Sequence, residues 1–260
     1  MTGDDEPAPP LLAAVDGGVL VVTIARPRQR NAVDRAVAEG IAQAMERLDE
    51  DDALRVGVLT GAGGCFSAGM DLKAFATGER PHVAGRGFGG LVERPPRKPL
   101  VAAVEGFALA GGMELALACD IVVAARDARF GVPEVQRGLV PAAGALLRLP
   151  AMIGRSAALE LVLTGEPIDA ERASDLGLVA RVAEPGQALP TALALARRIA
   201  ANAPLATLAA KRVVDEAPTW SGPDRWALQR RVVEPVLASR DAREGARAFA
   251  ERRAPIWSGH

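Results

Sequence analysis

Hydrophobic positions divide the chain into an N-terminal part of short apolar runs and a C-terminal part with helical periodicity. Two β-like runs, 11–15 and 19–25, flank Asp16-Gly17-Gly18, and this pattern predicts a hairpin. Residues 32–49 place apolar side chains on one face at helical spacing and predict an amphipathic helix. Short apolar runs predict buried strands at 56–60, 100–104 and 121–125. A helix is expected over 111–119.

From about residue 144 the pattern is almost entirely helical. Helices are expected at 156–164, 169–176, 187–201, 204–216, 223–238 and 241–253. Ser156 and Asp169 are the expected N-caps of the first two. Residues 77–98 are rich in Gly, Pro and Arg and predict a mobile loop.

Strands that alternate with helices, followed by a helical third, indicate an α/β fold. We divide the chain into a disordered lead, a core and a helical C-terminal region, at 1–10, 11–200 and 201–260. The C-terminal region is expected to form a lid, an oligomer interface, or both.

Composition excludes several classes of protein. The 260 residues include 31 Lys and Arg against 32 Asp and Glu, so no global field attracts nucleic acid or an anionic membrane. Cys65 and Cys119 lack metal-ligand spacing and form no disulfide framework, which suits a reducing compartment. The acidic N-terminus is unlike a signal peptide, and no apolar run reaches transmembrane length. We therefore expect a cytoplasmic protein.

The first segment that suggests chemistry covers residues 63–72, with the sequence Gly-Gly-Cys-Phe-Ser-Ala-Gly-Met-Asp-Leu. Its small residues let backbone N–H groups approach a ligand, although a plain strand-to-helix turn has the same composition. A nucleophilic Ser67 is disfavoured, because Cys65 stands where a nucleophile elbow needs glycine. A triad also lacks a well-placed histidine, since the chain has only His82 and His260.

The second segment covers residues 105–120, where a small-residue turn leads into a helix that is apolar on nearly every side. Such a helix must be buried, so Glu114 in its first turn must be paired, protonated or functional. Gly111 opens the helix, where free N–H groups favour a developing negative charge. The alternatives are a carboxylate that stabilises the helix start and a glycine that only allows close packing.

The third segment covers residues 128–141. Pro133 and Gly138 bracket a loop that presents Glu134. Taken alone this is a weak signal, because a glutamate in a loop is usually a solvated surface residue.

Together these segments resemble the crotonase family, also called the enoyl-CoA hydratase/isomerase family, from about Val19 to the end of the chain. The motifs that carry the resemblance are Arg26-Pro27 with Asn31-Ala32, residues 66–72, 110–116, 130–134, 241–245 and 249–253. The resemblance implies a spiral of ββα units and a helical C-terminal region that forms trimers, often paired as a dimer of trimers. The sequence departs from the family's pattern at Ala110, in the turn 142–145 and at Arg30, where other residues are usual.

The resemblance also implies a site. A bent acyl-CoA would place its thioester oxygen on the N–H groups of Ala68 and Gly111, and Glu114 and Glu134 would do acid–base work on water. The residues expected to bind the substrate are Arg28, Arg30, Gly69, Met70 and Asp71. A neighbouring chain would add Arg252 or Arg253 to the coenzyme A phosphates. No metal and no cofactor is expected, because coenzyme A is part of the substrate.

The expected activity is therefore that of an enoyl-CoA hydratase, which adds water reversibly to a trans-2-enoyl-CoA and gives a 3-hydroxyacyl-CoA. Acids at both 114 and 134 favour hydration over the other reactions of the family. The alternatives are an isomerase, a dehydratase or a thioesterase acting on another acyl-CoA. A non-catalytic scaffold, for example for RNA, is a further alternative, and the lack of a basic, aromatic-rich patch disfavours it.

Overall fold

A six-stranded sheet forms the centre of the protein, seen here in a computed structural model that describes residues 9–260. The expected disordered lead lies almost wholly outside the described residues. The strand order is β1-β2-β3-β6-β8-β11, and only the β1–β2 pair is antiparallel. The strands are β1 (Leu11–Asp16), β2 (Val19–Ile24), β3 (Val56–Gly61), β6 (Leu100–Val104), β8 (Ile121–Ala125) and β11 (Arg181–Ala183). The expected hairpin and all three expected buried strands are confirmed.

A second sheet of three short strands lies beside the first, in the order β10 (Ile168–Asp169), β9 (Arg129–Gly131) and β7 (Phe107–Leu109). The chain runs from β6 into β7 and then into helix α3 (Gly111–Leu117), and it repeats the step from β8 into β9 and further helices. This succession is the ββα repeat that the sequence resemblance implied. The α/β class is confirmed.

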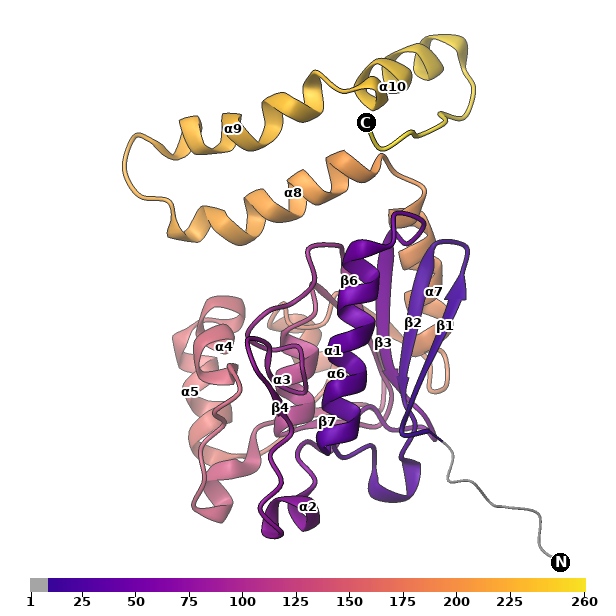
Figure 1. The fold of residues 1–260 in the computed structure, drawn as a ribbon. Helices are drawn as coiled ribbons and strands as arrows, with labels where there is room; N and C mark the ends of the chain where they lie inside the picture. The colour runs from indigo at the N-terminus through magenta and orange to yellow at the C-terminus, as the bar shows by residue number, and fades with distance from the viewer. Residues whose placement is uncertain (1–8) are drawn as a thin grey trace, which may run out of the picture.

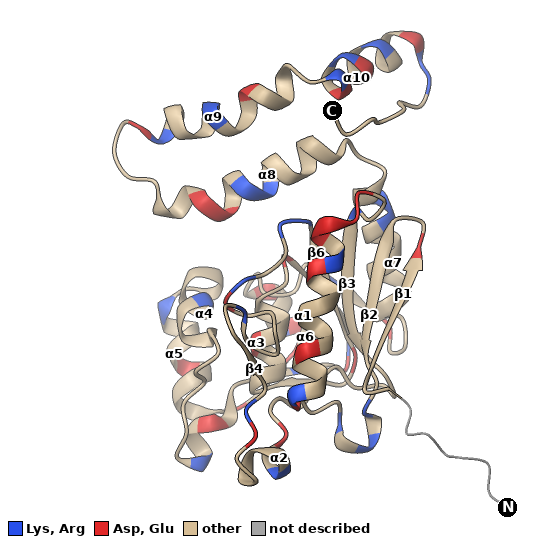
Figure 2. Ribbon diagram, in the orientation of Figure 1, with Lys and Arg blue, Asp and Glu red and all other residues tan. Residues whose placement is uncertain are grey.

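Helices cover both faces of the large sheet (Figure 1). Helices α1 (Arg35–Glu50) and α3 pack on one face, and α7 (Ala188–Ala200) packs on the other. Successive side chains of a strand point to opposite faces, so Leu20 faces α1 whereas Val19 belongs to the α7 side. Strands β2, β3 and β6 carry no charged residue, and charges of both signs are spread over the helices (Figure 2). The inner strands β3 and β6 are thus buried on both faces, whereas the edge strand β1 is largely exposed.

Most of the remaining helices follow the periodic pattern of the sequence, but those at 72–76 and 145–153 were not expected from it. The remaining helices are α2 (Leu72–Ala76), α4 (Ala145–Ile153), α5 (Arg155–Thr164), α6 (Ala170–Asp175), α8 (Pro204–Glu216), α9 (Arg225–Leu237) and α10 (Arg240–Glu251). Helices α8, α9 and α10 stand apart from the sheet, beyond the end of α7 (Figure 1). Within residues 9–260, no helix has the length and apolar character needed to cross a membrane.

Two local expectations from the sequence are wrong. Ser156 does not cap α5, because that helix begins at Arg155 and Ser156 lies inside it; Asp169 does cap α6, through a bond from the Arg172 N–H. Residues 77–98 are not a mobile loop, since Phe88 and Leu91 are buried with their neighbours and a short β4–β5 ribbon (His82–Val83, Gly87–Phe88) runs through the segment. The glycines in this segment permit close packing: a Cβ on Gly89 would lie 2.7 Å from Leu115.

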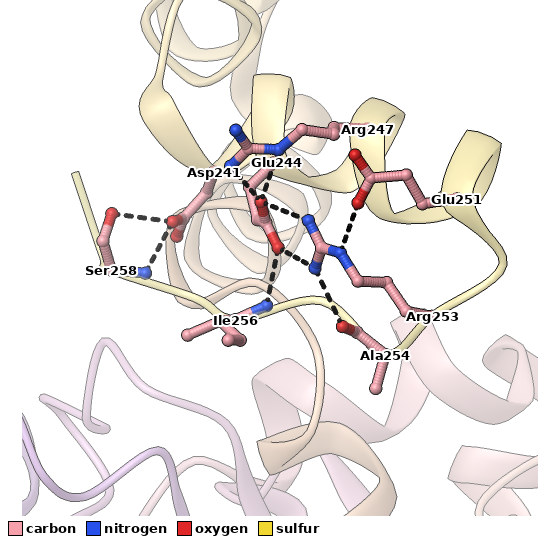
Figure 3. A network of polar contacts seen from close by, with 8 residues as sticks. All are labelled: Asp241, Glu244, Arg247, Glu251, Arg253, Ala254, Ile256 and Ser258. Atoms are coloured by element: carbon pink, nitrogen blue, oxygen red, sulfur yellow. Dashed lines mark hydrogen bonds and ion pairs between the residues drawn. The ribbon is translucent and has the colours of Figure 1, made fainter.

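The end of the described chain folds back along α10 and is held by two acidic side chains of that helix (Figure 3). The Asp241 carboxylate accepts bonds from the N–H and the hydroxyl of Ser258, and Glu244 accepts from the N–H of Ile256. Arg253 donates to Glu244 and Glu251. These contacts commit the Arg253 guanidinium to its own chain, so of the two arginines expected to reach a neighbour's substrate, Arg252 remains the better candidate.

Candidate active site

The residues singled out in the sequence meet at one end of two neighbouring parallel strands. In the small sheet Leu109 at the end of β7 pairs with Gly131 at the end of β9, and the Ala110 N–H donates to the Gly131 carbonyl at 2.9 Å. The carboxyl ends of parallel strands lie at the same edge of a sheet. The helix that carries Glu114 and the turn that carries Glu134 therefore start side by side.

The segment 67–70 joins this edge from the other side of β7. A parallel bridge pairs Ser67 with Ala108, and the hydroxyl of Ser67 donates to the Asn31 carbonyl while it accepts from the N–H of Gly69. Ser67 is fully buried by these contacts. Its hydroxyl therefore fixes the backbone of the segment, which agrees with the expectation that it is no nucleophile.

The structure corrects the expected role of Ala68. The N–H of Ala68 donates to the Arg30 carbonyl at 3.0 Å, so it is not free for a substrate. Val33 pairs with Met70 in a parallel bridge: the Val33 N–H donates to the Gly69 carbonyl, and the Val33 carbonyl accepts from the Asp71 N–H. In such a pairing the N–H of the residue between them, Met70, points away from the segment 31–33. Among the described residues, the Met70 N–H has no hydrogen-bond partner. We therefore assign the first donor to Met70 in place of Ala68.

The second expected donor, Gly111, keeps its place. It is the first residue of α3, and its N–H has no partner within the part of the chain that the structure describes. A Cβ on Gly69 would lie 2.8 Å from the Gly111 nitrogen, so the backbone before Met70 lies directly against the start of α3. Two free N–H groups thus stand close together at a helix N-terminus, where the dipole favours negative charge.

Gly111 is also a packing glycine. A Cβ at this position would overlap the ring of Phe88, which is buried in the segment 77–98. The packing interpretation weighed from the sequence is therefore supported, and the oxyanion role of Gly111 stays a prediction. The preceding residue, Ala110, has φ +51° and ψ −128°, a conformation that non-glycine residues rarely adopt. Backbone strain is thus located at the start of α3.

Glu114 lies on α3 with only 3% of its surface exposed. Its Oε1 accepts bonds from the N–H of Ala143 at 2.7 Å and from the N–H of Ala145 at 3.1 Å. Burial raises the pKa of this carboxyl to about 7, and the two N–H bonds oppose the rise without cancelling it. A carboxyl that titrates near neutrality can exchange protons in both directions, as acid–base catalysis requires.

Glu134 lies in the 3₁₀ turn Pro133–Arg137, which follows β9. Its Oε2 is buried and has no hydrogen-bond partner among the described residues. Burial also raises the pKa of this carboxyl, while its own N–H and the charge of Arg137 act in the opposite direction. Buried polar atoms in native proteins nearly always have a partner, so this oxygen indicates a place for a water molecule or a ligand.

The charge of Glu134 is one of the influences on Glu114. The charge of Glu134 raises the pKa of Glu114. Where two neighbouring carboxyls interact strongly, they release their protons in two steps that belong to the pair, and one stays protonated while the other is ionised. The arrangement can therefore activate one water molecule and supply one proton at the same time.

The expected substrate-binding residues divide into two groups. Arg28 and Arg30 are exposed and available to phosphates. The Asp71 carboxylate is committed within the protein, because it caps α2 through the N–H groups of Lys73 and Ala74 and pairs with Arg26 at 2.9 Å. Asp71 therefore holds the loop in shape. No group of three or more His, Cys, Asp or Glu side chains within residues 9–260 is arranged to hold a metal ion.

Three parts of the site were missed from sequence: the Met70 N–H, the turn that holds Glu114, and Phe88. The motif at 66–72 contains Met70, but only the pairing with Val33 shows which N–H is free. The turn 142–145 was noted as unusual, without a link to Glu114. Phe88 lay in the segment expected to be mobile, and no pattern in the sequence connects it with Gly111.

Comparison with known proteins gives matches over nearly the whole chain. Residues 14–260 match the family model described as enoyl-CoA hydratase/isomerase. The chain is 42% identical to the enoyl-CoA hydratase EchA19 of Mycobacterium tuberculosis, over 96% of this chain and 97% of that protein. It is 41% identical to a carnitinyl-CoA dehydratase of Salmonella arizonae, over 94% and 97%. The crystal structure of the enoyl-CoA hydratase EchA1 of Mycobacterium marinum superposes with a TM-score of 0.95 at 56% identity, covering 97% of this chain and all of that one.

Proposed function

Because the chain belongs to the enoyl-CoA hydratase/isomerase family, we propose that it is an enoyl-CoA hydratase that adds water reversibly across the double bond of a trans-2-enoyl-CoA. The observation that carries the proposal is the meeting of Glu114 and Glu134 beside two free N–H groups. A hydratase needs these three parts together: a polarised carbonyl, a held water and a proton donor. The relatives named as enoyl-CoA hydratases support the same activity.

The thioester carbonyl is the group that the free N–H groups would bind. With its oxygen on the N–H groups of Met70 and Gly111, negative charge that develops during the reaction is stabilised by two donors that already point at it. Each such donor is worth about 3 kcal/mol of transition-state stabilisation. Polarisation of the carbonyl withdraws electrons through the conjugated double bond, which leaves C3 open to attack by water.

The two glutamates would share the proton transfers. Glu114 uses one oxygen to accept the bonds from the turn 143–145, which leaves the other for the water that attacks C3. Glu134 offers its unpartnered Oε2 and delivers a proton to C2. Water thus gives its hydroxyl to C3 and a proton to one carboxylate, and the other carboxyl gives a proton to C2. The pair returns to its starting state after one further proton exchange.

Dehydration is the second reaction that this site supports. The relative named as a carnitinyl-CoA dehydratase is 41% identical to the chain. Loss of water from a 3-hydroxyacyl-CoA is the reverse of hydration, so the same N–H groups and carboxyls serve both directions. The position of equilibrium and the supply of substrate then decide which direction runs.

We further propose that the enzyme acts as a trimer or as a dimer of trimers in the cytoplasm. Large apolar side chains are exposed on the C-terminal helices, including Val214, Leu237 and Phe249, and Phe249 is 88% exposed. Apolar surface of this kind marks an interface. Arg28 and Arg30 would bind the coenzyme A phosphates. The two thiols, Cys65 and Cys119, are free and buried, as suits a reducing compartment.

The direct test of the activity is a spectroscopic assay with crotonyl-CoA. The conjugated enoyl thioester absorbs in the ultraviolet, and this absorbance disappears when water adds. Addition of the purified protein should cause a rapid loss of absorbance, which stops at the equilibrium of the reaction. Unchanged absorbance over many enzyme equivalents of substrate would overturn the proposal.

A further inference from the structure

Arg148 stands one helical turn after the N-terminus of α4, next to the turn that holds Glu114. Its guanidinium folds back over Gly144, so closely that a Cβ on that glycine would overlap the guanidinium. Gly144 has φ +109°, a conformation that glycine adopts without cost. The arginine therefore covers the same turn, 143–145, whose N–H groups bond to Glu114.

The other side of the guanidinium reaches the segment that carries Phe88. Its Nη2 donates to the carbonyl of Val92 at 2.5 Å, and the N–H of Val92 approaches the carbonyl of Phe88 at 3.4 Å. Phe88 in turn lies against Gly111. One side chain therefore joins the turn that holds the proposed acid–base residue to the segment that packs on the proposed oxyanion hole.

The charges around Glu114 come from three elements. The charge of Arg148 on α4 lowers the pKa of Glu114, and Glu134 from the 3₁₀ turn raises it. Glu114 on α3 and Cys119, just after the end of that helix, are the charged or titratable groups that act on Arg148. Burial raises the pKa of the Cys119 thiol, so that thiol stays neutral at physiological pH. Burial lowers the pKa of Arg148, but a guanidinium remains charged in proteins. Arg148 is thus the cation whose charge acts on Glu114.

We propose that Arg148 is a positioning residue for the reaction, which fixes the turn 143–145 against the segment 88–92 and keeps a positive charge beside Glu114. The expected effect of Arg148 on turnover rests on the proposed hydratase activity. Arg148 does not touch the reacting atoms in this scheme. It acts through Glu114 on one side and through the packing of Phe88 on Gly111 on the other.

The alternative is that Arg148 has a purely structural role. The bond to Val92 alone would then stabilise the fold, and loss of the arginine would lower the melting temperature without an effect on the titration of Glu114. The two interpretations differ in a quantity that can be measured. A cation near a carboxyl favours its ionised form, so its removal moves the titration midpoint to higher pH.

The experiment compares Arg148→Gln, which removes the charge, with Arg148→Lys, which keeps it. The readout is the ¹³C carboxyl titration of labelled glutamate in the full protein, with the Glu114 signal assigned by its absence in Glu114→Gln. We expect the midpoint to move to higher pH in Arg148→Gln and to stay at the wild-type value in Arg148→Lys. In both variants kcat/KM for crotonyl-CoA should fall by roughly 10- to 100-fold, because the turn and the hole lose their alignment.

Arg212→Gln, which removes an exposed arginine on α8, is the matched control and should change neither quantity. An unmoved midpoint in Arg148→Gln would overturn the proposal, and so would an equal shift in both variants. If Arg148→Gln does not fold, Arg148→Met removes the charge, keeps an apolar side chain of similar length and should move the midpoint in the same direction; no shift there also overturns the proposal. Wild-type protein without hydratase activity would instead contradict the proposed function, and the titration would still decide on Arg148.

Discussion

Gly69 lies so close to Gly111 at the proposed oxyanion hole that a Cβ on Gly69 would lie 2.8 Å from the Gly111 nitrogen. Gly69 also has φ +92°. Any other residue at this position would both strain the backbone and push apart the two N–H donors. The spacing of the hole is therefore set by the lack of a side chain at residue 69.

We predict that Gly69→Ala lowers kcat/KM for crotonyl-CoA by roughly 100-fold, because small displacements of aligned groups cost rates of this order. The matched control is Gly64→Ala. Gly64 has a similar positive φ of +72° but open space where its Cβ would stand. That variant should lose about 1 kcal/mol of stability from strain and keep its turnover. Equal losses of activity in the two variants would show that strain, and not the spacing of the donors, decides the effect.

The pKa of Glu114 predicts how stability depends on pH. The carboxyl titrates at about 7 in the folded protein and at its ordinary value of 4.5 when unfolded. Between these two pH values the folded state holds a proton that the unfolded state has lost. The contribution of this carboxyl to the free energy of unfolding is therefore fully present below pH 4.5 and is lost as pH rises to about 7. The change amounts to about 3 kcal/mol.

Glu114→Gln cannot titrate and should lack this dependence, while its side-chain oxygen can still accept the bonds from the turn 143–145. Urea unfolding of both proteins at a series of pH values gives the comparison. The stability of Glu114→Gln relative to the wild type should rise across the window. A constant difference from pH 4.5 to pH 7.5 would contradict the assigned environment of Glu114.

The sequence predicted most of the secondary structure because strand and helix periods were clear in it. The central strands 100–104 and 121–125 have the expected bounds, and α8 begins at Pro204 as expected. Helix α4 was missed because Gly144 and Pro150, one at its start and one inside it, resemble signals that end a helix. The ribbon in 77–98 was missed because its glycines serve close packing, which composition alone does not distinguish from mobility.

The sequence predicted the side chains of the candidate site but not both of its backbone donors. Glu114 and Glu134 stand out in sequence because one lies on a buried helix and the other follows a rigid turn. The proposed oxyanion hole depends on which backbone N–H groups point into it, and the pairing of the strands sets their direction. Ala68 and Met70 are two residues apart and equally plausible from sequence, and only the bond from Ala68 to Arg30 excludes the first.

Coenzyme A binding gives a third prediction. Arg28→Gln combined with Arg30→Gln should raise KM for crotonyl-CoA by about tenfold with little change in kcat, because these exposed guanidinium groups are proposed to bind the phosphates and not the reacting carbon. The same double variant should bind crotonyl-pantetheine, which lacks the nucleotide, as the wild type does. Added salt should weaken the wild-type interaction with the full substrate more than with the short one. If the double variant bound crotonyl-CoA and crotonyl-pantetheine equally weakly, the proposal that Arg28 and Arg30 bind the phosphates would be wrong.

The exposed apolar side chains of the C-terminal helices give a fourth prediction. We expect light scattering to report a trimer or hexamer, and Phe249→Asp to shift the protein toward the monomer. Val15→Asp, which places the same charge on a half-exposed residue of β1, is the control and should leave the assembly intact. A wild-type protein that remains monomeric at working concentration would contradict the proposed assembly.

The central claim is that Glu114 and Glu134 add water to an enoyl thioester, and a labelled-water experiment tests it most directly. Crotonyl-CoA is incubated with enzyme in H₂¹⁸O, and the products are weighed by mass spectrometry. The account predicts 3-hydroxybutyryl-CoA with one ¹⁸O on C3, formed by the wild type and slowed by about 10² to 10⁴-fold in Glu114→Gln and in Glu134→Gln. Glu160→Gln, an exposed carboxyl on α5, should react as the wild type does. Label found only in free crotonic acid, a shifted double bond without label, or full activity in either glutamine variant of the pair would contradict it.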